Sequence, residues 1–106
     1  MTSQMTPVLY PCESWPVDSF KVCCPKCRFE YQHHGGVLVF NRVGGEDGPS
    51  IVTAVDLPID QITDDNPSSR RGAIRVFFVG ECSHEWWLDI VQHKGETYLF
   101  AGMADE

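Results

Sequence analysis

The sequence has little positive charge, no long apolar run and no helical periodicity. It carries 8 Lys and Arg against 15 Asp and Glu, a formal net charge of −7. An acidic protein repels phosphate backbones at long range, which disfavours nucleic acid as a partner. The longest strongly apolar run, residues 76–79, falls far short of the roughly 20 residues that span a bilayer. We therefore expect no membrane partner and no helical domain.

Targeting and catalytic signatures are also missing. The first twenty residues lack a basic start and contain Pro7, Pro11 and Pro16, unlike a signal peptide, so we expect a cytoplasmic protein. No nucleophile–base–acid arrangement and no phosphate-binding glycine loop can be identified, and we expect no enzyme. The 106 residues fit one domain.

What the sequence does contain is a series of short strands separated by glycine and proline turns. Alternation is clearest in residues 73–80, where Ile74 and Val76 would face one side and Arg75 and Phe77 the other. The paired glycines Gly35 and Gly36 predict a break. We expect a β-rich fold, a single small antiparallel-sheet domain. Its predicted strands cover residues 20–23, 28–34, 37–43, 50–56, 73–80, 86–92 and 97–100.

The pattern divides the chain into two parts. Residues 1–19 predict an irregular N-terminal arm, because their prolines exclude a regular helix. Apolar residues there would anchor the arm on the domain: Val8, Leu9, Tyr10 and Trp15. Residues 20–106 predict a zinc-ribbon-like β domain. The polar segment 57–71 is expected to be a loop, with at most one helical turn near residues 58–63.

Cysteine spacing predicts one structural zinc site. Cys24 and Cys27, two residues apart between predicted strands, can both direct thiolates onto one tetrahedral ion. Cys82 and His84 form a second half-site in a later turn. With five cysteines and no secretion signal, metal binding is favoured over disulfides. A redox pair at Cys24 and Cys27 is disfavoured, because such pairs open a helix, and cysteines as plain core residues remain an alternative.

The fourth ligand has competitors. His84 adjoins an accepted ligand and needs no extra bend in the chain. His33 or His34 is an alternative, although an extended strand would carry His33 roughly 20 Å from Cys27. Cys23 or Cys12 is a further alternative. Three sulfurs activate water poorly, so the site is expected to be structural rather than catalytic.

Two tryptophans beside the second half-site are favoured as a covered hydrophobic pair, and an exposed tryptophan that marks a partner surface is the alternative. Trp86 and Trp87 should point to opposite sheet faces, one in the core near the metal and the other available to a partner. Three arginines could add a basic patch, although ion pairs with Asp64 and Asp65 in a solvated loop are the favoured reading. These are Arg70, Arg71 and Arg75.

Four segments together resemble a group of short zinc-ribbon-like proteins of actinobacteriophages and their prophages. They are CPKCRFEYQHHGGVLVFNR, NPSSRRGAIRVFF, GECSHEW and VQHKGETYL, within roughly residues 22–100. The resemblance implies a CxxC near the start, a late cysteine turn and a histidine near His33 or His34. Many relatives carry a second CxxC, with a cysteine where this chain has Val79, which leaves Cys82 alone here.

These observations predict a small non-catalytic zinc-binding module. We expect a phage accessory protein that acts by protein–protein interaction, with a host or phage protein as its partner. A nucleic-acid-binding zinc ribbon is one alternative, with Lys21, Lys26 and Arg28 joining the three arginines on phosphates. A minor structural protein of the virion is the other.

Overall fold

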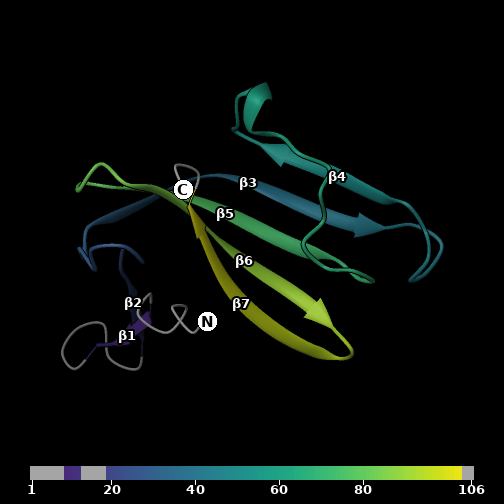
Figure 1. Cartoon of the computed structure of the whole chain (residues 1–106), viewed down its shortest axis with the longest axis horizontal. Coiled ribbons are helices and arrows are strands. Elements are labelled where there is room, and N and C mark those ends of the chain that lie inside the picture. The colour runs from purple at the N-terminus through teal and green to yellow at the C-terminus, as the bar shows by residue number, and fades with distance from the viewer. Residues whose placement is uncertain (1–8, 13–18, 104–106) are drawn as a thin grey trace.

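Seven strands in two antiparallel sheets make up the fold of this computed structural model, which describes residues 9–12 and 19–103 (Figure 1). The larger sheet has the strand order β4-β3-β5-β6-β7. Its strands are β3 (Gln32–Arg42), β4 (Ser50–Val55), β5 (Ala73–Gly80), β6 (Glu85–His93) and β7 (Glu96–Met103). The smaller sheet pairs β1 (Leu9–Pro11) with β2 (Phe20–Val22). The expected β-rich antiparallel domain is confirmed.

Side-chain alternation places the sheet residues as predicted. Paired residues share a face, so Phe40, Ala73 and Val91 lie on one side, whereas Leu88 and Ala101 lie on the other. The turn between β6 and β7 has positive φ at Lys94 (52°) and Gly95 (80°). Two successive positive φ values match the right-handed twist of the flanking strands, which explains the tight hairpin.

Strand β3 runs through the glycine pair at which a break was predicted. The register against β5 instead shifts between His34 and Val37, so Gly35 and Gly36 form a bulge within one long strand. A Cβ at Gly36 would lie 2.3 Å from Cγ of Leu57. Glycine at this position therefore lets the connection after β4 pack directly on the strand.

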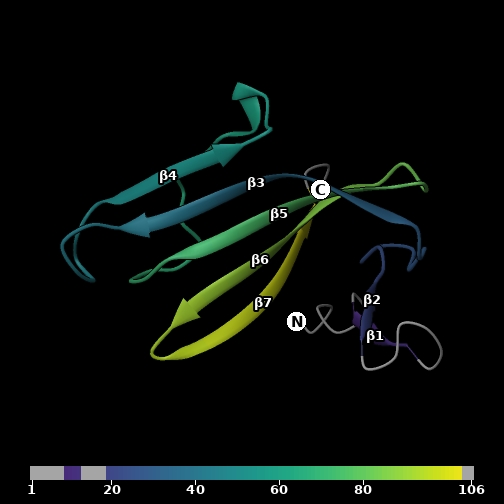
Figure 2. The same ribbon diagram turned by 180° about the vertical axis from the view of Figure 1, so that it is seen from behind.

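The N-terminal segment differs from the predicted irregular arm in that Leu9–Pro11 is a strand. Leu9 is opposite Val22 and Tyr10 is opposite Lys21. The small sheet lies beside one end of the large one in both views (Figures 1 and 2). The predicted anchors Val8 and Trp15 lie outside the described residues.

Two apolar clusters occupy opposite faces of the large sheet. On the first, which we call the loop face, Leu38 and Phe40 are fully buried, and Leu57 of the β4–β5 connection packs against them. On the second, the arm face, Trp86 and Leu88 are covered by residues of the small sheet, Leu9 and Val22. The connection crosses β3 on its way to β5 and contains one 3₁₀ turn, η2 (Ile59–Gln61) (Figure 1). None of the described residues form a helix long and apolar enough to cross a membrane.

Candidate metal centre

The first half-site is a tight turn between β2 and β3. The backbone N–H of Arg28 donates to the carbonyl of Cys24 (2.8 Å), and the N–H of Cys24 donates to the carbonyl of Phe29 (3.0 Å). Arg28 has a φ of 66°, which reverses the chain. The N–H of Lys26 points at Sγ of Cys24, 3.4 Å away. The turn thus directs a backbone donor at the sulfur of Cys24.

The second half-site is the turn between β5 and β6. The N–H of Gly80 donates to the carbonyl of His84 (3.0 Å), and the N–H of Ser83 donates to the carbonyl of Gly80 (2.9 Å). Ser83 has a φ of 74°. The N–H of Glu81 donates to the carbonyl of Tyr31 (3.0 Å), which joins this turn to the segment leaving the first one.

Together the two turns bring four ligand atoms into one cluster. The three Sγ atoms and one imidazole nitrogen of Cys24, Cys27, Cys82 and His84 all lie within 4.8 Å of one another. Nδ1 of His84 lies 3.4 Å from Sγ of Cys24. Cys24 is buried, Cys82 and His84 are half-buried, and Cys27 is exposed. The four residues are close enough to bind a metal ion.

The local electrostatics favour a thiolate at Cys82. Burial raises the pKa of this thiol, but hydrogen bonds oppose that effect and lower the pKa from its usual 9.0 to about 6. The backbone of His84 contributes most to this lowering, followed by the Cys27 thiol and then by the side chains of Gln32 and His84. The thiolate is the form of cysteine that binds a metal ion. The lowered pKa therefore means that protons compete less with a metal ion for Cys82.

The competing fourth ligands lie elsewhere. Nε2 of His33 is 2.9 Å from Oε2 of Glu81, and the ring of His34 packs edge-on against Phe78. Neither histidine is a member of the four-residue cluster, and neither is Cys12. Cys23 also lies outside it, and burial raises the pKa of its thiol, so Cys23 is held as a neutral core group.

Gln32, at the start of β3, supports the cluster and was not identified from the sequence. Its Nε2 donates to the carbonyl of Phe29 (2.8 Å) and lies 3.9 Å from Sγ of Cys82. Its Oε1 accepts from Nε1 of Trp86 (2.8 Å). A Cβ at Gly80 would lie 2.6 Å from the Gln32 amide and 2.7 Å from Sγ of Cys82. The sequence signal that could have indicated this support is Gly80, which ends β5 just before the turn that carries Cys82.

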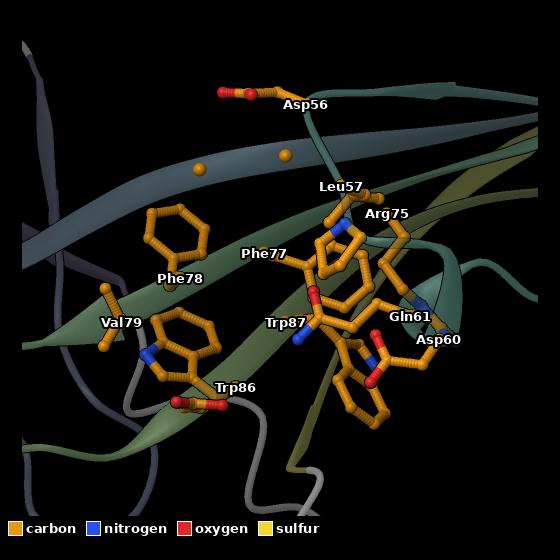
Figure 3. Close-up of a pocket in the computed structure, with 14 residues that line it drawn as sticks. Asp56, Leu57, Asp60, Gln61, Arg75, Phe77, Phe78, Val79, Trp86 and Trp87 are labelled. Carbon is orange, nitrogen blue, oxygen red and sulfur yellow. The ribbon is translucent and has the colours of Figure 1, made fainter.

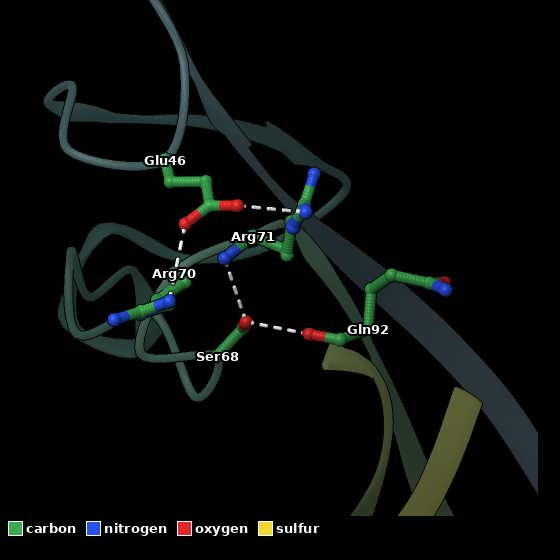
Figure 4. Close-up of polar contacts among 5 residues, drawn as sticks. All are labelled: Glu46, Ser68, Arg70, Arg71 and Gln92. Carbon is green, nitrogen blue, oxygen red and sulfur yellow. Dashed lines mark hydrogen bonds and ion pairs between the residues drawn. The ribbon is translucent and has the colours of Figure 1, made fainter. Parts of the chain in front are cut away.

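The basic patch, the less favoured interpretation of these arginines, is neutralised, because each of the three arginines has an acidic neighbour. Arg70 and Arg71 both pair with Glu46, at 3.3 and 2.8 Å (Figure 4). The prediction that these arginines form ion pairs within the chain is therefore confirmed. The predicted partners, Asp64 and Asp65, were wrong. Glu46 lies in the β3–β4 turn, which faces the connection only in the folded chain.

The third arginine, Arg75, belongs to a different setting. Its guanidinium makes a two-point contact with the buried carboxylate of Asp89, at 2.7 and 2.9 Å. The same group lies 4.6 Å from the ring centre of Trp87. Trp86 is buried on the arm face, while Trp87 is half-buried on the loop face, so the predicted division of the two tryptophans between faces is confirmed.

Comparison with protein-family models, with curated proteins and with solved structures gave no match.

Proposed function

We propose that this chain is a non-catalytic zinc-binding module that acts by binding another protein. The observation that carries the proposal is the convergence of three cysteines and one histidine from two turns far apart in the sequence. Each of these turns is held by its own backbone hydrogen bonds.

The donor set suits zinc. Zinc binds thiolate and imidazole at about 2.3 and 2.0 Å, so tetrahedral donors are about 3.5–3.8 Å apart. The 3.4 Å between Sγ of Cys24 and Nδ1 of His84 is close to this edge length. Three thiolates and an imidazole also form one of the common structural zinc sets, and oxygen-preferring ions such as Mg²⁺ and Ca²⁺ would find no oxygen ligand among them.

A structural role follows from the number of ligands. A catalytic zinc keeps one position open for water or substrate, whereas four protein ligands fill a tetrahedral ion. Bound zinc would fasten the β2–β3 turn to the β5–β6 turn, since each turn supplies two of the ligands. Its contribution is therefore rigidity of the scaffold.

A protein partner fits the surface better than a nucleic acid does. The net charge is −7, and Arg70, Arg71 and Arg75 are engaged by Glu46 and Asp89. Lys21 likewise pairs with Glu30. Phosphate binding would require these contacts to break. The resemblance to actinobacteriophage proteins suggests a host or phage protein in the host cytoplasm as the partner.

Elemental analysis of the purified protein tests the metal assignment. We expect one zinc per chain, lost in His84→Ala and retained in the matched variants His33→Ala and His34→Ala. A chain purified under reducing conditions without zinc, or zinc retained by His84→Ala, would overturn the assignment.

Binding experiments test the mode of action. Tagged protein expressed at native level in an actinobacterial host should co-purify with a specific protein. It should produce no shift of single- or double-stranded DNA or RNA at low salt, where phosphate contacts are strongest. A salt-dependent shift at micromolar protein would favour the nucleic-acid alternative.

A further inference from the structure

A cleft on the loop face lies apart from the cluster of metal ligands. It opens between the 3₁₀ turn η2 and strands β5 and β6, and has a volume of about 460 Å³. Figure 3 shows Asp60 and Gln61 extending from η2 toward the rings of Phe77 and Trp87. Functional ligand sites commonly measure about 300–1,000 Å³ and combine apolar walls with a few polar groups.

The aromatic wall of the cleft is held in place from several sides. The rings of Phe77 and Trp87 meet edge to face, with centres 6.0 Å apart. A Cβ at Gly102 would lie 2.3 Å from Nε1 of Trp87, so the indole rests on β7 where no side chain intervenes. The Gly35–Gly36 bulge also borders the cleft, and Leu57 occupies the space beside Gly36.

Charge around the cleft is negative. Asp56, Asp60 and Glu85 line it with exposed carboxylates, and no ion pair joins them to a cationic side chain in the described part of the chain. The one cation in the lining, Arg75, is already neutralised by the two-point contact with Asp89. Asp60 and Glu85 thus leave uncompensated negative charge at the cleft, whereas the carboxylate of Asp56 is turned away from the aromatic rings (Figure 3).

We propose that this cleft binds a basic segment of the partner protein, with a lysine or arginine side chain inserted against Phe77 and Trp87. The long methylene stems of these residues pack well on apolar surface while the charged head remains at the rim. Asp60 and Glu85 would attract that head, and a cation placed over an aromatic face gains a cation–π contribution. An acidic or phosphorylated ligand would meet repulsion from the same carboxylates.

This inference rests on the proposed function, because it specifies the surface and the partner chemistry of a protein-binding module. It also differs from the basic partner surface that the sequence analysis left as an alternative. Trp87 belongs to the interface, but the charges that select the partner are acidic.

The test is titration of the zinc-loaded protein with an amidated, acetylated nonapeptide of alternating lysine and glycine. We expect the indole N–H resonance of Trp87 to shift in nitrogen–proton spectra. That of Trp86 should move less, because its indole N–H is buried and donates to Gln32, although Trp86 also borders the cleft. The matching glutamate peptide should shift neither. No Trp87 shift at millimolar lysine peptide, or an equal shift with the glutamate peptide, would overturn the inference.

Charge removal at the rim adds a second measurement. The double variant D60N/E85Q should weaken peptide binding by at least about threefold, the effect of losing two exposed attractions. The control D65N removes an exposed carboxylate of the same connection outside the cleft and should bind as the wild type does. Unchanged zinc content and an unmoved Trp86 resonance would establish that the variants fold. Equal affinity in all three proteins would overturn the inference.

The same variants separate this inference from the proposed function. If the partner co-purifies equally with wild type and D60N/E85Q, the cleft is not its binding site, and the proposed function stands. If no partner is found while the lysine peptide binds as expected, the cleft stands and the proposed mode of action fails.

Discussion

The two ends of the large sheet are held together by different means. At the end near the β3–β4 turn, which we call the loop-covered end, Leu38 and Phe40 are fully buried beneath the β4–β5 connection. At the metal end, two turns meet at the four-ligand cluster, and Cys27 remains exposed. One end depends on apolar burial under a well-bonded loop, and the other on ligands that a cation would join.

The bonding of the connection explains why the loop-covered end needs no ion. Ser68, which is 1% exposed, donates from Oγ to the carbonyl of Gln92 (2.7 Å) and accepts from the N–H of Arg71 (2.9 Å) (Figure 4). Arg42 adds hydrogen bonds to the carbonyls of Gly48, Ser68 and Arg71. These polar contacts hold the irregular β4–β5 connection in place. They also give its buried backbone groups the hydrogen-bond partners that such groups need. The metal end instead gathers three thiol groups and one imidazole into a single cluster.

Removing the metal should cause the largest loss of stability, and it should affect the metal end before the loop-covered end. With the ion chelated under reducing conditions, we expect the free energy of unfolding to fall by about 5 kcal/mol or more, since binding energy contributes directly to folding at such sites. Urea denaturation measures the loss. Amide exchange should accelerate at residues 24–29 and 80–84 before it does at Phe40 and Ala73. Identical unfolding curves before and after chelation would remove the distinction between the ends.

The truncation Phe40→Ala should destabilise the loop-covered end without affecting the metal. Phe40 is fully buried, and such a cavity costs about 3–5 kcal/mol. Zinc content should remain that of the wild type. The control Ile51→Ala changes a side chain that is 51% exposed and should shift the unfolding midpoint little. Loss of zinc from a folded Phe40→Ala protein would mean that the two ends are not independent.

Ser68→Ala tests the polar bonding of the connection. The substitution leaves the carbonyl of Gln92 and the N–H of Arg71 without their partner, at a cost of about 1–3 kcal/mol. Ser69→Ala, a neighbouring exposed serine, is the matched control and should be close to neutral. Denaturation midpoints compare the pair, and equal midpoints would show that the hydroxyl of Ser68 is dispensable.

The smallest effect is expected at Glu46. Glu46→Gln removes the attraction to Arg70 and Arg71, whose side chains are 59% and 48% exposed, and exposed pairs contribute at most about 1 kcal/mol. The free energy of unfolding of Glu46→Gln should be lower than that of the control Asp47→Asn. This difference should shrink in 1 M salt, because salt screens exposed charges. A salt-independent loss would indicate that the hydrogen bonds, rather than the charges, stabilise the connection.

The parts of this structure that local patterns encode could be predicted from the sequence. The alternation of Ile74, Arg75 and Val76 fixed the faces of β5, and the spacing of Cys24 and Cys27 identified one half-site. His84 was favoured because it adjoins Cys82 on a short turn. In each case the signal lies within a few residues, where chain geometry allows few outcomes.

The features that were missed depend on contacts between distant segments. Gly36 looks like a strand break until Leu57 is seen to occupy the space beside it. Arg70 and Arg71 lie close in sequence to Asp64 and Asp65, yet pair with Glu46 across the connection. The strand Leu9–Pro11 has only three residues and ends in proline, so it carries almost no strand signal without its partner β2.

The order of the ligands along the chain has a consequence for synthesis. Cys24 and Cys27 leave the ribosome early, but Cys82 and His84 follow only after β3, β4 and β5 have been made. At about 5–20 residues per second, the first two thiols wait several seconds for the other half of their site. During that interval the nascent chain has only two of its four ligands. A cation captured early would be held by two sulfurs alone, or would exchange with other cations. Completion of the β5–β6 turn is thus the earliest moment at which the newly made protein has all four ligands.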